Sequence, residues 1–375
     1  MAGKRKKKIR VAFRKNRQKR TRSGDLTRQI RNDLDELDQI ESGERISGKG
    51  ELTRHRTIIA DADEDGTAVL RQVDEAACLR GRVRSAIGAN NCQVETPDGS
   101  LYHCTVRRVL RTLLRQARSP VVAGDLVLFQ PEGDSKGVIE RVEPRHGTLS
   151  RVSRGLEHVI AANSDQALIV GSAAEPQLKP SLIDRFLVSA GKGGLHVIIC
   201  INKVDLTDAT ALQPIAGMYG RLGYDVVMTS ATEGHGVDHL RRLLHGRQTL
   251  VAGQSGVGKS SLLNAVQPGL GRAISGVSRD SGKGRHTTRV TELIPLTEGG
   301  SVIDTPGIRQ FELWDVIAEE VEAWFVEFRP FVALCRFPDC SHTHEADCAV
   351  KQAVVEGRIA SHRFESYVRI MSGDS

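Results

Sequence analysis

The sequence lacks the features that would place it in a membrane or outside the cell. It has no apolar run near the roughly 18 residues that a transmembrane helix requires. Its first residues are basic but include neither an apolar core nor a small-residue cleavage site, so they do not resemble a secretory signal. Seven cysteines, an odd number, without such a signal indicate reduced thiols. We therefore expect a cytoplasmic protein that makes no membrane contact.

Acidic residues are absent from positions 1–22, which carry twelve Lys and Arg. Without these twelve, 41 basic and 46 acidic residues remain, so the net charge of +7 becomes −5. A basic arm of this kind favours contacts with nucleic-acid phosphates, although a solvated tail or an address signal is an alternative. We expect residues 1–75 to form a basic, largely disordered extension.

At 375 residues the chain is too long for one ordinary domain, because about 150 residues per domain suggests two or three. Five short alternating strands between 79 and 145, two of them flanking a Pro97-Asp98-Gly99 turn and one running from Val121 to Phe129, predict an OB-fold or similar β-barrel over 76–150. Five arginines between its strands suit an RNA backbone or form a solvated loop: Arg107, Arg108, Arg111, Arg115 and Arg118.

From about residue 165, apolar strands alternate with helical patterns, which predicts an α/β domain over 151–312. Its phosphate-binding pattern, G-x-x-x-x-G-K-S/T, is matched by Gly253-Gln254-Ser255-Gly256-Val257-Gly258-Lys259-Ser260. A strand pattern precedes it and a helical one follows from Ser261, which we also count as nucleotide-binding. Glycines let backbone N–H groups surround the phosphates at the helix start. Lys259 would contact the β- and γ-phosphates and Ser260 would bind Mg²⁺; a chance glycine-rich turn is the alternative.

A guanine-recognition motif follows a buried strand at 195–201 and reads Asn202-Lys203-Val204-Asp205. The Asp205 carboxylate would accept from the N1–H and exocyclic amine of guanine, donors that adenine does not present, so adenine would leave it unpaired. A four-residue match to the guanine-recognition motif is weak evidence by itself. It becomes strong evidence because the same sequence also contains the phosphate-binding pattern. After the next strand, Ser230 and Ala231 would back the base.

Two segments beyond the phosphate loop match the switches of a GTPase. A Gly-, Ser- and Arg-rich stretch at 269–288 resembles a mobile loop in which Thr287 or, preferably, Thr288 would contact Mg²⁺ and the γ-phosphate. A later strand ends in Asp304-Thr305-Pro306-Gly307, where Asp304 would hold Mg²⁺ through water and the Gly307 N–H would contact the γ-phosphate. Release of these contacts on hydrolysis is the GTPase switch.

The position that in many GTPases holds a water-orienting glutamine is Ile308, which cannot hydrogen-bond water. The free protein should therefore hydrolyse GTP slowly. His286 in the switch loop is the best internal replacement, because a neutral imidazole can orient water or accept its proton. A solvated loop histidine is the alternative.

The C-terminal segment carries Cys335, Cys340, His342 and Cys348 within 14 residues. Three thiolates and an imidazole suit tetrahedral zinc, and a closed set of four implies a structural ion. His344 could substitute for His342. A helix over 350–371 would pack on this loop and complete a small helical zinc domain over 313–375. The other thiols are expected to be ordinary buried residues: Cys78, Cys92, Cys104 and Cys200.

The guanine motif precedes the phosphate loop here, whereas in most GTPases it follows, so the domain is circularly permuted. From about Leu79 onward, the chain resembles the circularly permuted bacterial ribosome small subunit-dependent GTPase A family. The resemblance rests on the barrel, the motifs above, the Cys-Cys-His-Cys set, Gly284-Arg285-His286-Thr287-Thr288 and Asp304-Thr305-Pro306-Gly307-Ile308-Arg309-Gln310-Phe311. It implies an OB-fold, a permuted P-loop GTPase domain and a zinc domain. Residues 1–75 depart from the family's usual short N-terminus.

The resemblance also implies GTP hydrolysis in late maturation of the small (30S) ribosomal subunit, stimulated by that subunit. The expected partners are the subunit, its rRNA and other assembly factors, and the protein itself is expected to be a monomer. Three alternatives stay open: a permuted GTPase of the large subunit, a metabolic P-loop kinase or ATPase, and a nucleotide-regulated or non-enzymatic RNA-binding protein. The zinc set opposes a GTPase of the large subunit. The Asn202 to Asp205 motif opposes a kinase or ATPase, and the intact Lys259 opposes a non-enzymatic protein.

Overall fold

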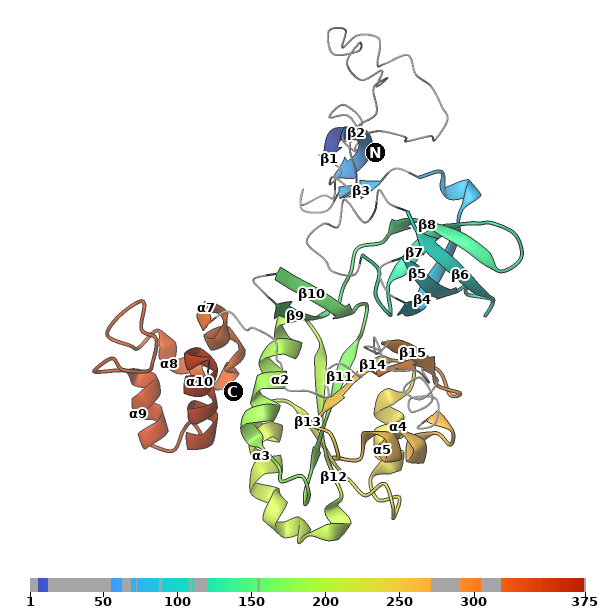
Figure 1. Ribbon diagram of the computed structural model, residues 1–375. Helices are drawn as coiled ribbons and strands as arrows, with labels where there is room; N and C mark the ends of the chain where they lie inside the picture. The colour runs from blue at the N-terminus through green and yellow to red at the C-terminus, as the bar shows by residue number, and fades with distance from the viewer. Residues whose placement is uncertain are drawn as a thin grey trace, which may run out of the picture.

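Three structural units follow one another along the chain: a β-barrel, an α/β unit and a group of C-terminal helices (Figure 1). This order confirms the predicted architecture. The computed structural model describes three N-terminal strands at 6–12, 55–62 and 69–71, and residues 73–87, 90–107, 110, 120–153, 156–270, 291–304 and 318–373.

The barrel closes on itself, because its strands follow the order β4-β5-β6-β8-β7 and β7 pairs back with β4. Its interior is apolar, and the rings of Tyr102 and Phe129 pack with centroids 5.0 Å apart. The five strands are β4 (Leu79–Ile87), β5 (Asn91–Glu95), β6 (Leu101–Val106), β7 (Leu126–Pro131) and β8 (Lys136–Val142).

Two sequence-based details of this region are wrong. The strand predicted from Val121 begins at Leu126, because Gly124 has a φ of +90° and the Asp125 carboxylate accepts from the Val122 N–H at 2.8 Å, which closes a turn. Cys78 is half-buried rather than buried, because it follows a 3₁₀ turn at the barrel's entrance, η5 (Glu75–Ala77). The other three thiols outside the C-terminal segment are buried, as expected.

The α/β unit is a sheet whose parallel strands run in the order β13-β12-β11-β14-β16, with β15 antiparallel beside β16. Successive side chains point to opposite faces, so Ile169 and Ile199 pack under α2 and α3 while Leu168 and Ile198 pack under α4 and α5. The strands are β11 (Gln166–Ser172), β12 (His196–Asn202), β13 (Asp225–Thr229), β14 (Gln248–Gly253), β15 (Glu292–Pro295) and β16 (Ser301–Asp304); the helices are α2 (Pro180–Lys192), α3 (Gln213–Arg221), α4 (Val237–Leu244) and α5 (Lys259–Val266).

The C-terminal helices pack against the α2 side of the sheet, and Val188 of α2 belongs to their core (Figure 1). The single helix predicted over 350–371 is wrong, because Gly357 with a φ of +71° and the extended Ala360 divide it into two. The elements are α7 (Ala318–Val321), η9 (Glu322–Trp324), η10 (Val326–Phe328), α8 (Arg329–Val332), α9 (Ala349–Val355) and α10 (Ser361–Ser372).

Among the described residues, a strand pairing joins the barrel to the α/β sheet, with Glu292 of β15 opposite Ser85 of β4. Between the two units, β9 (Leu149–Ser153) and β10 (Leu156–Ala161) form a hairpin. In the N-terminal extension, an antiparallel sheet joins β1 (Lys6–Ala12), β2 (His55–Ala62) and β3 (Val69–Arg71), which the basic composition did not predict. No described helix has the length and apolar character needed to cross a bilayer.

Candidate nucleotide and metal sites

The carboxyl ends of the parallel strands bring the nucleotide motifs to one edge of the sheet. β12 ends at Asn202, which is in register with Ser172 at the end of β11, and β14 ends at Gly253 beside them. β16 ends at Asp304, level with Val251 of β14. Ligands of open α/β sheets bind at this edge. The guanine motif, the phosphate loop and the start of the second switch therefore meet there, although they are far apart in sequence.

The phosphate loop has a backbone that requires its glycines. Gly253, Gly256 and Gly258 have φ values of +144°, +85° and +90°, and a Cβ on Gly253 would lie 2.3 Å from the Val170 carbonyl oxygen. α5 begins at Lys259, whose Nζ donates to the carbonyl oxygens of Gly253 at 2.7 Å and Gln254 at 2.6 Å. The ammonium group therefore lies inside the loop, where phosphate oxygens can replace the carbonyls as acceptors.

Asn202 ties the guanine motif to the phosphate loop. Its side chain is 1% exposed, and Nδ2 donates to the Val257 carbonyl oxygen at 3.0 Å while Oδ1 accepts from the Thr229 hydroxyl at 3.1 Å. A Cβ on Gly258 would lie 2.5 Å from the same Nδ2, so only glycine permits this approach. These buried hydrogen bonds fix the two loops relative to each other. The sequence predicted Asn202 as a binding residue but did not predict this bridging contact.

Asp205 lies exposed beside the loop predicted to back the base. The Thr232 hydroxyl donates to its Oδ2 at 3.3 Å, and the hydroxyls of Ser230 and Thr232 lie 3.0 Å apart. Hydrogen bonding, first from Ser230 and also from Thr232, lowers the pKa of Asp205 below its ordinary value. The group is thus an ionised acceptor, as guanine recognition requires. Thr232 was missed in the sequence, where it stands just after the predicted Ser230 and Ala231.

A further loop, 173–179, touches both motifs and was also missed. The Glu175 carbonyl oxygen accepts from the Lys203 Nζ at 2.5 Å, with Lys203 in the left-handed region at a φ of +65°. The loop also approaches the phosphate loop, because a Cβ added to Gly256 would lie 3.5 Å from the Pro176 ring. No local pattern marks this loop as part of a nucleotide site, because its role depends on contacts with two distant segments.

Some predicted residues lie outside the described part of the chain. These are His286, Thr287, Thr288, Gly307 and Ile308, as well as four of the five barrel arginines. Of that arginine group, Arg107 is described, and its Nε lies 2.5 Å from Oε1 of the buried Glu140. Arg107, which is about one-third exposed, is therefore paired with a carboxylate of β8.

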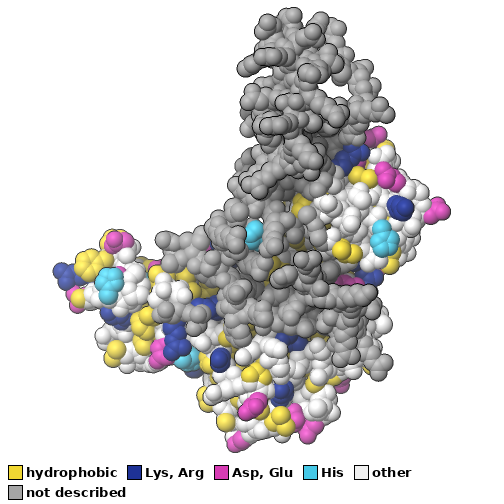
Figure 2. Space-filling view, viewed as in Figure 1, with side chains coloured by type: hydrophobic (Ala, Val, Ile, Leu, Met, Phe, Trp, Pro, Cys, Tyr) yellow, Lys and Arg dark blue, Asp and Glu magenta, His cyan; other side chains and the backbone are white. Residues whose placement is uncertain are grey.

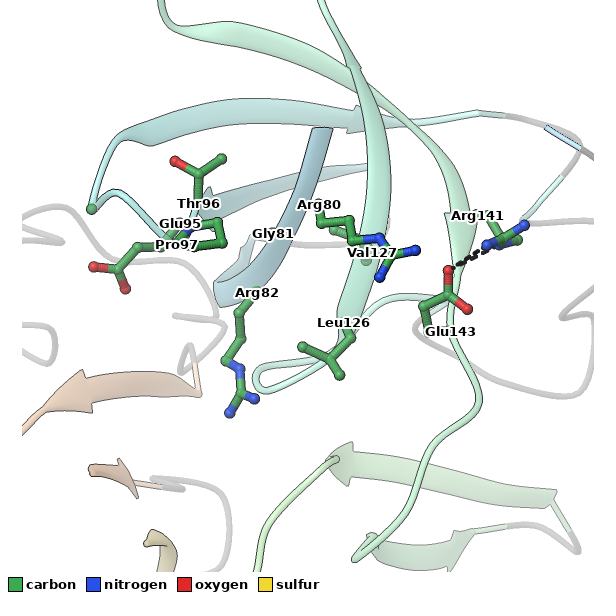
Figure 3. A pocket seen from close by; sticks show the side chains of 11 residues that line it. Arg80, Gly81, Arg82, Glu95, Thr96, Pro97, Leu126, Val127, Arg141 and Glu143 are labelled. Atoms are coloured by element: carbon green, nitrogen blue, oxygen red, sulfur yellow. Dashed lines mark hydrogen bonds and ion pairs between the residues drawn. The ribbon is translucent and has the colours of Figure 1, made fainter. Parts of the chain in front are cut away.

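A cavity of 610 Å³ opens on the barrel and is lined by residues of its strands and of the turn after β5 (Figure 3). The positive charge of Arg141, which lines this cavity, is balanced by two carboxylates, because its Nη2 lies 2.7 Å from Glu143 and 2.8 Å from Glu75. Arg80 also faces Glu75, at 3.5 Å. Cations and carboxylates are thus mixed on this surface.

The four predicted metal ligands converge, with all their ligand atoms within 4.8 Å of one another. The Nδ1 of His342 lies 3.5 Å from the Cys335 sulfur and 3.3 Å from the Cys348 sulfur. Burial and the neighbouring thiols raise the pKa of Cys340 to about 12. A bound cation would offset the free-energy cost of forming the thiolate there. The alternative ligand, His344, is 84% exposed and outside the group. Four such groups fit a tetrahedral metal ion.

Glu322 supports this cluster from η9. Its Oε2 accepts from the Nε2–H of His342 at 3.1 Å, which leaves Nδ1 free to face the sulfurs. A carboxylate behind a ligating imidazole fixes its tautomer and orientation. Sequence reasoning missed Glu322, since it precedes the first cysteine of the set and no spacing rule connects it to the histidine.

Comparison with known proteins gives the same picture. The family model described as RsgA GTPase matches residues 142–314. The chain is 41% identical over 304 residues to the small ribosomal subunit biogenesis GTPase RsgA of Yersinia pseudotuberculosis serotype O:1b (strain IP 31758), which covers 78% of this chain and 84% of that protein. It is 37% identical over 340 residues to the protein of the same name from Shewanella oneidensis, with coverage of 86% and 93%.

Solved structures agree with these relatives. The crystal structure of YjeQ from Thermotoga maritima superposes with a TM-score of 0.63 at 35% identity, covering 79% of this chain and 98% of that one. The structure of YloQ, described as a circularly permuted GTPase, superposes with a TM-score of 0.61 at 31% identity, with coverage of 81% and 97%. The sequence identity, the permuted motif order and the shared fold lead to one conclusion: the chain belongs to the RsgA family of GTPases.

Proposed function

We propose that this protein hydrolyses GTP to GDP and phosphate and acts on the small ribosomal subunit and its rRNA during late maturation. The observation that carries the proposal is the Asn202 bridge, because it couples a guanine motif to a phosphate loop in one site. Relatives that share 37% and 41% identity bear the name of small ribosomal subunit biogenesis GTPases. We place the protein in the cytoplasm as a monomer that meets other assembly factors on the subunit.

The site residues divide by the part of the nucleotide that they contact. Asn202, Lys203, Val204 and Asp205 hold the guanine with Ser230 and Ala231 behind it, and the backbone from Gly253 to Ser261 surrounds the phosphates at the start of α5. Lys259 neutralises charge on the β- and γ-phosphates. Mg²⁺ is held by Ser260, Thr288 and Asp304, while Thr287 and Gly307 complete the contacts to the γ-phosphate.

The cysteine–histidine cluster holds one structural Zn²⁺. Three sulfurs and one nitrogen form a soft, closed set that suits zinc, and the Glu322 carboxylate behind His342 strengthens the imidazole as a ligand. The domains are 1–75, an extension; 76–150, the barrel; 151–312, the GTPase domain; and 313–375, the zinc domain.

One experiment tests the function: GTP hydrolysis measured alone, with purified small subunits and with purified large subunits. Slow basal turnover that small subunits raise by orders of magnitude is expected, with little effect of large subunits. Stimulation by large subunits instead would assign the protein to the other assembly pathway. GTP binding without hydrolysis under any condition would favour a nucleotide-regulated RNA-binding protein.

A further inference from the structure

A cavity of 420 Å³ lies at the border of the GTPase domain and the C-terminal helices. One wall is the start of α2 with the residues before it, and the other is the last half of α10. We call this space the seam cavity. Its lining residues are Gln177, Leu178, Lys179, Pro180, Ser181, Leu182, Arg185, Ser366, Arg369 and Ile370.

The seam cavity is lined by cations and by no carboxylate. Lys179 and Arg369 are exposed, and within the described chain neither side chain forms an ion pair or a hydrogen bond. Arg185 is half-buried, and burial lowers its pKa below the ordinary value. The exposed charges of Lys179 and Arg369 lie at the same hollow, and an anion bound there would interact favourably with both. The barrel cavity differs, since its Arg80 and Arg141 face glutamates.

The border that holds the cavity is fixed by buried contacts. Arg363 of α10 donates to Asp184 of α2 at 2.7 Å, and the Cβ position of Gly191 in α2 is only 2.5 Å from the Trp324 ring. On the face shown in Figure 2, Lys and Arg side chains gather where the C-terminal helices meet the GTPase domain. The backbones of Lys179 and Arg369 are thus fixed relative to each other by buried contacts between α2 and the C-terminal helices.

The cavity also adjoins the nucleotide site through loop 173–179. Gln177, Leu178 and Lys179 line the cavity, while Glu175 and Pro176 of the same loop touch Lys203 and Gly256. An anion in the cavity and a nucleotide at the phosphate loop would therefore contact opposite sides of one short loop.

Charge favours RNA as the occupant. Apart from the twelve cations of the N-terminal arm, the protein carries 41 basic and 46 acidic residues, so its body does not attract a polyanion in general. An approach of RNA to the body requires a local group of uncompensated cations, and phosphate contacts from Lys and Arg supply most such affinity. We propose that the seam cavity binds backbone phosphates of the small subunit's RNA, an inference that rests on the proposed function.

The test compares Lys179→Gln and Arg369→Gln with Arg221→Gln. Arg221 is an exposed cation at the end of α3, near the opposite edge of the sheet, and serves as the matched control. Binding of each full-length protein to purified small subunits is measured over a range of salt concentrations. Each cavity variant should bind more weakly, with its log–log salt slope smaller by about one unit. The control should match the wild type, Arg369→Gln and Arg221→Gln should bind GTP like the wild type, and all four proteins should unfold at similar temperatures.

Wild-type binding that both cavity variants retain in full would overturn the inference and leave the proposed function standing. Failure of the wild type itself to bind small subunits would overturn both. A parallel titration with inorganic phosphate separates the sources of the anion: thermal stabilisation that the variants lose, together with unchanged subunit binding, would assign the cavity to a free anion and refute the RNA assignment.

Discussion

Arg363 and Asp184 form an ion pair in which both side chains are almost excluded from solvent, at 1% and 0% exposure. Nη1 of Arg363 lies 2.7 Å from Oδ1 of Asp184, while its Nε and Nη2 donate to Glu327 at 2.6 and 3.1 Å. The Tyr219 hydroxyl donates to the same Asp184 oxygen at 2.7 Å. Arg363 of α10 thus joins the C-terminal helices to Asp184 of α2, which in turn binds Tyr219 of α3.

Arg363→Met should lower the free energy of unfolding by about 3–5 kcal/mol, because it leaves two carboxylates buried without a cation. Burial alone would lower the pKa of Arg363, but Asp184 and Glu327 outweigh it and raise the pKa, so the group stays charged. Urea unfolding measures the loss. The control is Lys192→Met, which removes a half-exposed pair with Glu320 between α2 and α7 and should cost at most about 1 kcal/mol. Equal losses would contradict the assignment.

Asp205→Asn should weaken GTP binding and move the preference toward xanthosine triphosphate, whose 2-oxo group can accept from the new amide. Competition among GTP, ATP and XTP measures the change. Asp208→Asn removes the same charge three residues later, where the carboxylate accepts from the Thr210 N–H at 2.9 Å, and should leave the preference unaltered. An Asp205→Asn protein that still selects GTP would refute the assignment.

The pH dependence of GTP binding follows from the same carboxylate. Hydrogen bonding from Ser230 lowers the pKa of Asp205, so the ionised acceptor persists as the pH falls through the ordinary range of carboxyl groups. Guanine selectivity over adenine should therefore be constant between about pH 8 and pH 5. Selectivity lost within that window would mean that another group recognises the base.

Cys340→Ser should release about one zinc per chain and unfold the C-terminal helices, since metal binding supplies folding energy there. Glu322→Ala should retain the four ligands but lower zinc affinity by about 10- to 100-fold, because His342 loses the carboxylate that orients it. Chelator competition followed by metal analysis measures both. Cys78→Ser, outside the cluster, should keep its zinc. Absence of zinc from the purified native protein would contradict this prediction.

His286→Ala should remove most of the stimulation of hydrolysis by small subunits while GTP affinity stays nearly unchanged, because the imidazole is proposed to position water rather than bind nucleotide. Turnover with saturating subunits and separate GTP binding measure the two effects. His239→Ala, an exposed histidine of α4, is the control. If stimulation survives in His286→Ala, ribosomal RNA or another side chain positions the water.

Local sequence determined the chemistry of this protein. The phosphate loop, the guanine motif and the four metal ligands are contiguous or closely spaced patterns, and each was predicted with its residues because the constraint acts over a few positions. The Gly253, Gly256 and Gly258 backbone, for example, is a local requirement that the amino acids themselves satisfy. Motif order alone also revealed the permutation.

Tertiary structure decided which distant segments support those patterns. Asn202 meets Val257 because β11 lies between β12 and β14, an order that the sequence does not follow. Glu322 reaches His342, Arg363 reaches Asp184, and the seam cavity forms only because α10 packs on α2. Such contacts carry no periodicity or spacing in the chain, since they arise from burial and charge pairing between surfaces that meet only after the sheet and helices have assembled.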